Sequence, residues 1–230
     1  MPRGTPDYKI YGEIAARLGS VVTLDRQGDV VWIDNFEAPV LKWDRAYVFG
    51  GEAPVLSSTY VYEGAQSVML SCGAVINSVS RISRSWGLLR PGKLGVELWV
   101  QGETDAPGYL ELTLGIFNGT QEATAELRYD STAQTITIVT ATGNFGVATN
   151  AMMRLNQNYW LPIKLVVDSQ TGLYTRLIVG GQIIDLSAYG LVMGALNASR
   201  YIYAIIEQNG IAARITRMYI DSFILTQNEG

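Results

Sequence analysis

The sequence predicts an all-β protein built as an antiparallel two-sheet sandwich. Apolar residues alternate with other residues in short runs, as in 161–167, where Leu161, Ile163, Leu165 and Val167 share one side. Clusters of Gly, Pro, Asp and Asn separate these runs at intervals of roughly ten to fifteen residues. No long helical pattern lies between the runs, and parallel strands would need such crossovers.

The central stretch shows this pattern most clearly. After the run 161–167, the sequence Asp168–Gly172 predicts a turn, and the next run places Leu173, Leu177 and Val179 on one face. Gly180-Gly181 then predicts a tight hairpin, and a third apolar run follows it. Three consecutive antiparallel strands are therefore expected here.

The N-terminal region predicts an arm and a short helix. Residues 1–9 are irregular, and Ile10, Ile14 and Leu18 follow at helical spacing with Gly19 as a C-cap. So short a helix needs a docking surface, which is either its own sandwich or a neighbouring subunit. We expect residues 1–29 to form the arm, the helix and the start of a hairpin, and residues 30–230 to form one domain.

The remaining strands are expected between turn signals. Asn209-Gly210 predicts a hairpin between 201–207 and 211–225, Asp130 to Ala133 predicts another, and an Arg-Gln-Gly-Asp turn predicts one between 21–24 and 30–33. The other expected strands are Ala46–Gly50, Leu56–Tyr62, Ser67–Cys72, Leu94–Gln101, Tyr109–Phe117, Ala123–Tyr129 and Thr135–Thr140.

Composition limits the partners. The chain has 230 residues, of which 17% are charged and 48% hydrophobic, with a net charge of -4. No basic cluster is available to neutralise phosphates, so no nucleic-acid partner is expected. No apolar stretch reaches about 18 residues and no secretory signal is visible, so we expect no membrane partner and synthesis in the cytoplasm. The low charged fraction favours a surface covered by copies of the chain or by other proteins.

Three segments resemble jelly-roll carbohydrate-binding modules. They are Asp34-Asn35-Phe36-Glu37, the segment 62–70 (YEGAQSVML) and the segment 219–225 (YIDSFIL). The stretch 160–172, with the Gly-Gly hairpin after it, is similar to the concanavalin A-like lectin/glucanase superfamily. This resemblance implies a two-sheet jelly roll. It leaves function open, because the superfamily includes lectins, glycosidases, adhesion modules and viral structural proteins.

The first 35 residues or so resemble the start of jelly-roll structural proteins of tailed phages. The resemblance rests on Thr5-Pro6-Asp7-Tyr8 and on a helix ending Ala15-Ala16-Arg17-Leu18-Gly19. It implies a virion component, such as a capsid decoration or auxiliary protein, with a capsid shell protein or further copies of the chain as partners. The alternative is a carbohydrate-binding module or adhesion protein, and the third reading is a jelly-roll glycosidase.

The acidic residues argue against catalysis. The sequence contains no histidine, which excludes Ser-His-Asp and Cys-His mechanisms. Paired glycosidase carboxylates could come from alternate positions of a strand, but the only such pair, Glu103 and Asp105, lies in a predicted loop. Outward-facing acidic residues in the strands are explained by cross-strand pairing with cations, and a non-enzymatic protein is expected. The acidic residues are Glu97, Glu111 and Glu126, and the cations are Arg128, Lys164 and Arg176.

Five aromatic residues form the candidate glycan-binding or interface surface. Alternation places them opposite the leucine and valine faces, where a row of rings suits either a sugar chain or a protein partner. They are Trp99, Tyr109, Phe117, Trp160 and Tyr174.

A structural calcium ion is the one cofactor considered. The jelly-roll resemblance implies such an ion near the first and last strands, where Asp34, Asn35, Glu37 and Asp221 would supply oxygen ligands. Ordinary turns at strand ends explain the same residues, so both interpretations stay open.

Overall fold

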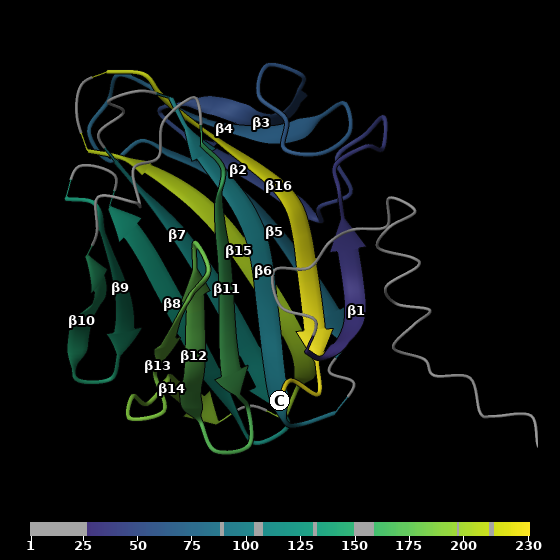
Figure 1. The fold of residues 1–230 in the computed structure, drawn as a ribbon, viewed down its shortest axis with the longest axis vertical. Coiled ribbons are helices and arrows are strands. Elements are labelled where there is room, and N and C mark those ends of the chain that lie inside the picture. Colours follow the sequence, from purple (N-terminus) through teal and green to yellow (C-terminus); the bar gives the residue numbers. More distant parts are fainter. Residues whose placement is uncertain are drawn as a thin grey trace, which may run out of the picture.

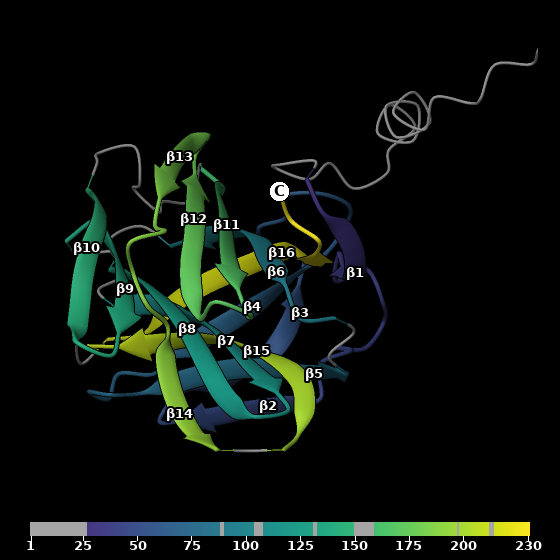
Figure 2. The same cartoon turned by 90° about the horizontal axis from the view of Figure 1, so that it is seen from below.

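The computed structural model describes residues 27–87, 90–103, 108–130, 133–149, 159–196, 198–211 and 214–230. Two antiparallel sheets of eight strands each pack face to face in this part of the chain (Figures 1 and 2), which confirms the all-β sandwich. The predicted arm and helix, with Ile10, Ile14 and Leu18, lie outside the described residues.

Sheet A has the order β13-β12-β11-β6-β16-β4-β3, with β1 beside β16. Its strands are β1 (Asp29–Asp34), β3 (Glu52–Ser57), β4 (Ser67–Cys72), β6 (Lys93–Gly102), β11 (Leu161–Asp168), β12 (Leu173–Val179), β13 (Gln182–Asp185) and β16 (Thr216–Gln227).

Sheet B has the order β10-β9-β8-β7-β15-β5-β2, with β14 beside β8. Its strands are β2 (Arg45–Phe49), β5 (Val79–Gly87), β7 (Gly108–Asn118), β8 (Gln121–Asp130), β9 (Thr135–Thr140), β10 (Gly143–Thr149), β14 (Val192–Leu196) and β15 (Arg200–Gly210).

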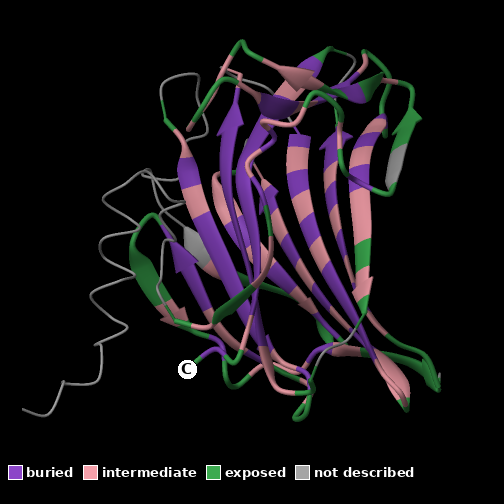
Figure 3. Cartoon of the chain, turned by 90° about the vertical axis from the view of Figure 1, so that its right-hand side faces the viewer, coloured by how far each residue is buried: buried purple, intermediate pink, exposed green. Residues whose placement is uncertain are grey.

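The core lies between the sheets and follows from strand alternation. In β8, Ala123, Ala125, Leu127 and Tyr129 are buried against the other sheet, while the residues between them are partly exposed. Figure 3 shows the same alternation as bands of buried and intermediate residues along neighbouring strands. Sheet B therefore keeps one face open, and its outer residues are available for contacts.

Two local predictions were wrong. The Asn209-Gly210 segment does not form a hairpin, because β15 belongs to sheet B and β16 to sheet A, so the chain changes sheets there. The predicted strand Leu56–Tyr62 ends early, since β3 stops at Ser57 and the following residues form a loop. The hairpin at Gly180-Gly181 and the one after Asp130 are confirmed by the β12–β13 and β8–β9 pairings.

A buried ionic cluster lies on the outer face of sheet A. Lys164 and Glu97 are register partners on β11 and β6, which confirms their predicted cross-strand pairing, but both are buried rather than solvated. Glu229 lies over them, with 2.8 Å from its Oε1 to Lys164 Nζ and 2.8 Å from its Oε2 to Arg176 Nη2. The C-terminal residues thus cover this part of the sheet.

No described helix is long and apolar enough to span a membrane.

Candidate functional site

The structure does not bring the five predicted aromatic residues together. Tyr109 and Phe117 lie on β7 and face outward from sheet B. Trp99 is on β6 of the opposite sheet and is only 4% exposed, because Tyr62 stacks on it with ring centroids 4.8 Å apart. Trp160 lies beside Tyr62, at 6.0 Å. The expected single row is therefore divided between two faces of the molecule.

Tyr174 faces the interior, contrary to prediction. The register of β11 with β12 shifts between Val166 and Val167. Val166 is the register partner of Arg176 and Val167 that of Tyr174, so Thr175 has no register partner on β11. Such a bulge reverses the alternation, and Tyr174 joins the core while Leu173 becomes 37% exposed. The Tyr174 hydroxyl donates to the Val139 carbonyl at 2.7 Å, so this residue serves the core and not a surface site.

Charged side chains form a row across the outer face of sheet B. Tyr47, Arg81, Glu207, Glu111 and Arg128 are successive register partners on β2, β5, β15, β7 and β8. Arg81 pairs with Glu207 at 3.3 Å, and Arg128 pairs with Glu111 at 3.0 Å. Glu111 therefore points outward and pairs with a cation of the neighbouring strand, as expected for the acidic residues of the strands.

Each arginine of this row also covers a tyrosine ring. The guanidinium carbon of Arg81 lies 4.7 Å from the ring centroid of Tyr47, and that of Arg128 lies 4.3 Å from the centroid of Tyr109. Arg128 additionally approaches Glu126 at 3.5 Å. Burial, and next the charge of Glu111, raise the pKa of Glu126 above its usual value.

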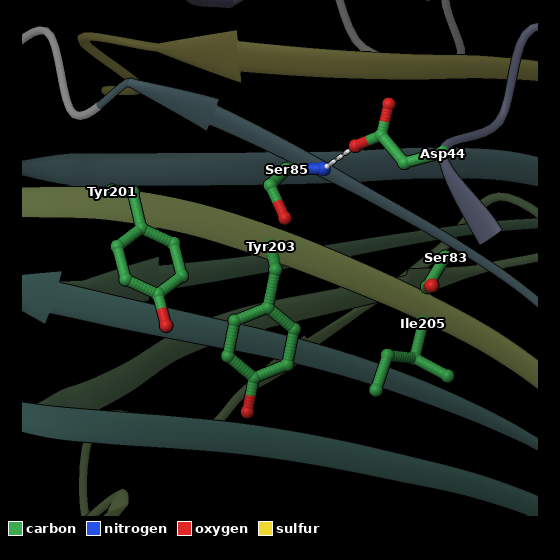
Figure 4. Close-up of a pocket in the computed structure, with 6 residues that line it drawn as sticks. All are labelled: Asp44, Ser83, Ser85, Tyr201, Tyr203 and Ile205. Carbon is green, nitrogen blue, oxygen red and sulfur yellow. Dashed lines mark hydrogen bonds between the residues drawn. The ribbon is translucent and has the colours of Figure 1, made fainter.

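A hollow of about 550 Å³ opens beside the charged row on the same face. Two alternate residues of β5 and three of β15 line it, together with Asp44 from the segment before β2 (Figure 4). The Asp44 carboxylate accepts a 2.7 Å hydrogen bond from the Ser85 amide, which holds the segment before β2 against β5 at the side of the hollow. The lining residues are Asp44, Ser83, Ser85, Tyr201, Tyr203 and Ile205.

The tyrosines of the hollow are held in place by neighbours on β7 and β8. Tyr201 stacks on Phe117, with centroids 4.2 Å apart and planes at 19°. The ring of Tyr203 lies directly over Gly115. A Cβ at this position would be 2.0 Å from the ring, so the absence of a side chain at Gly115 makes room for it. The Tyr203 hydroxyl donates to Glu122 Oε1 at 2.9 Å, and burial together with this carboxylate raises the pKa of the phenol to about 12.

Two of the predicted calcium ligands, Asp221 and Glu37, accept backbone amides of the same loop. Asp221 Oδ2 accepts the amides of Tyr62 and Glu63 at 2.9 and 3.2 Å. Glu37 Oε1 accepts two amides of the same loop, at 2.8 and 2.9 Å. Burial above all raises the pKa of Asp221 to about 6.

Asp34 bonds within its own turn, to the Phe36 amide at 2.9 Å. Among the described residues no three acidic or cysteine side chains gather closely enough to hold a metal ion. Amide donors, rather than an assembled set of oxygen ligands, surround Glu37 and Asp221, so the arrangement does not fit the implied cation.

The residues of the hollow are not among those that the sequence predicts as a site. Strand β5 carries the alternating sequence VSRISRSWG, whose apolar positions are few, and it was not recognised as a strand. The alternation of Tyr201, Tyr203, Ile205 and Glu207 in β15 was visible and places all four on one side. Without a recognised β5 beside them, nothing in the sequence indicated a shared hollow.

The solved structures that resemble this chain share its fold at low sequence identity. An endo-β-1,4-glucuronan lyase from the fungus Trichoderma reesei matches with a TM-score of 0.57 and 12% identity, covering 86% of this chain and 96% of the lyase. A Bacillus subtilis protein of unknown function with a galectin-like fold also reaches 0.57, at 12% identity, covering 88% of this chain and 97% of its own. The cellulose-induced protein Cip1 reaches 0.53 at 13% identity, covering 85% and 96%.

At the level of sequence, no protein-family model matches the chain and no curated protein resembles it. Identities of 12–13% establish a shared fold and nothing finer. The resemblance to the phage structural proteins has no counterpart among these structures. The chain shares the two-sheet β-sandwich fold of these proteins, one of which is described as galectin-like.

Proposed function

We propose that the outer face of sheet B binds a carbohydrate and that the protein is a non-catalytic glycan-binding module. The hollow carries this proposal, because it combines aromatic rings with hydrogen-bonding groups. Tyr201 and Tyr203 offer apolar ring faces for a sugar, and Ser83, Ser85 and Asp44 offer donors and acceptors for its hydroxyls.

The comparisons support a carbohydrate ligand. Two of the proteins with this fold have names that refer to a polysaccharide. One is a glucuronan lyase and the other is a protein induced by cellulose. Fold alone does not transfer their activities, so the evidence for binding by this chain is the chemistry of its own hollow.

The state of the polar groups favours binding over catalysis. Glu122 accepts the Tyr203 hydroxyl, and Glu207 and Glu111 are paired with arginines, so each of these groups already has a structural role. The phenol of Tyr203, with its pKa raised to about 12, is a poor base near neutral pH.

Glycoside hydrolysis is the second candidate, and Glu126 favours it. Its raised pKa beside Glu111 is the property of a general acid paired with a second carboxylate. Prolonged incubation with polysaccharides and assay of new reducing ends tests this candidate. Turnover that disappears in Glu126→Gln would establish an enzyme and overturn the non-catalytic proposal.

The predicted role in a virus particle stays a prediction. The low charged fraction remains its argument, and the exposed apolar residues at one end of the sandwich, which include Phe49, Val75 and Ile76, are compatible with a protein partner. Sedimentation of a native lysate tests it: recovery of the chain in a megadalton particle supports assembly, and recovery near the mass of one to three chains contradicts it.

Affinity electrophoresis through gels containing soluble polysaccharides tests the glycan proposal. We expect at least one polysaccharide to retard the protein, and Tyr203→Ala to abolish the retardation. Tyr62→Ala is the matched control, because Tyr62 is a 42% exposed tyrosine of sheet A's outer side. Loss of binding in Tyr62→Ala alone would move the site to the group of Tyr62, Trp99 and Trp160 on that side.

A further inference from the structure

The charges around the hollow indicate which class of glycan it takes. Of the six lining residues that the structure describes, four carry hydroxyl groups, one is apolar, and one, Asp44, is a carboxylate, so none of these six is a cation. A sugar carboxylate would therefore meet no positive partner within the lining, whereas sugar hydroxyls would meet both donors and acceptors.

The two arginines of the charged row beside the hollow are already paired with glutamates. Arg81 is held by Glu207 at 3.3 Å, and Arg128 by Glu111 and Glu126 at 3.0 and 3.5 Å. Both arginines also lie on tyrosine rings, which restricts their movement toward a ligand. A sugar carboxylate could recruit them only by breaking these pairs.

Carboxylates outnumber the described cations on this face. Glu122 lies at the aromatic end, and Glu111, Glu126 and Glu207 lie in and beside the charged row. At the edge of the hollow, Arg84 approaches Asp44 at 3.7 Å. The side chains that the structure describes here therefore include five carboxylates, Asp44, Glu111, Glu122, Glu126 and Glu207, and three arginines, Arg81, Arg84 and Arg128. Burial above all raises the pKa of Glu126, and the charges of Glu111 and Glu207 raise it further.

We infer that this face takes an uncharged glycan and rejects chains of uronic acids. The inference rests on the proposed function and adds its substrate class. It also separates this chain from the glucuronan lyase that shares its fold, whose named substrate is a polymer of glucuronic acid. Selection works by repulsion, since another negative charge would have to enter a surface that is already overloaded with carboxylates.

The experiment compares neutral with acidic polysaccharides. Xyloglucan, mixed-linkage β-glucan and galactomannan form the neutral set, and glucuronan, alginate and polygalacturonate form the acidic set. Affinities are measured by isothermal titration calorimetry at low and at physiological salt. We expect a neutral polymer to bind and the acidic polymers to bind at least tenfold more weakly at low salt, with a smaller difference at physiological salt.

A double variant tests the cause. Glu122→Gln with Glu126→Gln removes two negative charges while keeping an acceptor for the Tyr203 hydroxyl, and should raise the affinity for acidic relative to neutral polymers roughly tenfold. Glu103→Gln is the matched control, because this glutamate has a similar exposure, pairs with Arg217 of sheet A, and should leave the ratio unchanged.

The outcomes separate the two proposals. Tighter or equal binding of acidic polymers overturns the selectivity and leaves glycan binding standing. Binding of neither set overturns both. A neutral preference that the double variant leaves unchanged shows that the carboxylates do not cause it, and that result also refutes the inference.

Discussion

Gly115→Ala tests the arrangement of the hollow without altering any group that lines it. The added Cβ would lie 2.0 Å from Cε1 of Tyr203, and ordinary contact begins at 3.4 Å, so the ring must withdraw by about 1.4 Å. The obstacle is the far end of a side chain that can rotate, so the strand itself need not move. The substitution should therefore displace Tyr203 and break its hydrogen bond to Glu122.

The expected effect on folding is small, and the effect on binding is larger. Loss of the hydrogen bond costs about 1 kcal/mol, while replacing a strand glycine by alanine returns about 0.5 to 1 kcal/mol, so the free energy of unfolding should change by less than about 1 kcal/mol. Loss of the ring as a stacking platform should weaken glycan binding by about 1 to 1.5 kcal/mol, or roughly five- to tenfold. Urea unfolding and calorimetry measure the two quantities.

Titration of the phenols gives a readout that needs no ligand. In the native protein Tyr203 has a pKa of about 12, so Tyr203→Phe should barely alter the absorbance change below pH 11. In the Gly115→Ala background the displaced phenol gains solvent, and its pKa should fall toward 10. The same Tyr203→Phe change should then remove the signal of one tyrosine. An identical titration in both backgrounds, with binding unchanged, would refute the placement of Tyr203 over Gly115.

Two further predictions concern stability. Lys164→Met should lower the free energy of unfolding by about 3 to 5 kcal/mol, because it removes the buried cation that Glu97 and Glu229 share and leaves Arg176 to pair with Glu229, whereas Arg217→Met, in an exposed pair, should cost less than about 1 kcal/mol. Equal losses in urea unfolding would contradict the burial of the cluster. Asp221 has a folded pKa of about 6 against an ordinary 3.8, so the unfolded chain releases this proton first, and stability should fall by at most about 3 kcal/mol as the pH rises from 4 to 6. Asp221→Asn should remove this part of the pH dependence, and an unchanged slope would show that another group causes it.

The sequence predicts the fold class well, because alternation in the strands is imposed by the core. The runs at 161–167 and 123–129 alternate without interruption and occur as β11 and β8. Prediction fails where tertiary structure overrides local signals. Asn209-Gly210 is a strong turn sequence, yet the chain there passes from one sheet to the other, which no local pattern encodes.

The candidate site was harder to predict, since it depends on register and on long-range coverage. A single unpaired residue in β12 turns Tyr174 from the surface into the core. The loop that carries Tyr62 covers Trp99, and nothing in the alternation of β6 indicates that cover. Tyr201 and Tyr203 become a site only because β5 pairs with β15 and places two serines beside them.

The pairing of β1 with β16 determines on which side of the molecule the described part of the chain begins and ends. Asp29 is the register partner of Gln227, so both ends of the sandwich leave from neighbouring strands of sheet A. A linker attached at Gly230, to a resin, a fluorophore or a second domain, therefore departs from the side opposite to the outer face of sheet B (Figure 2). Proteins immobilised through this end would display that face away from the support.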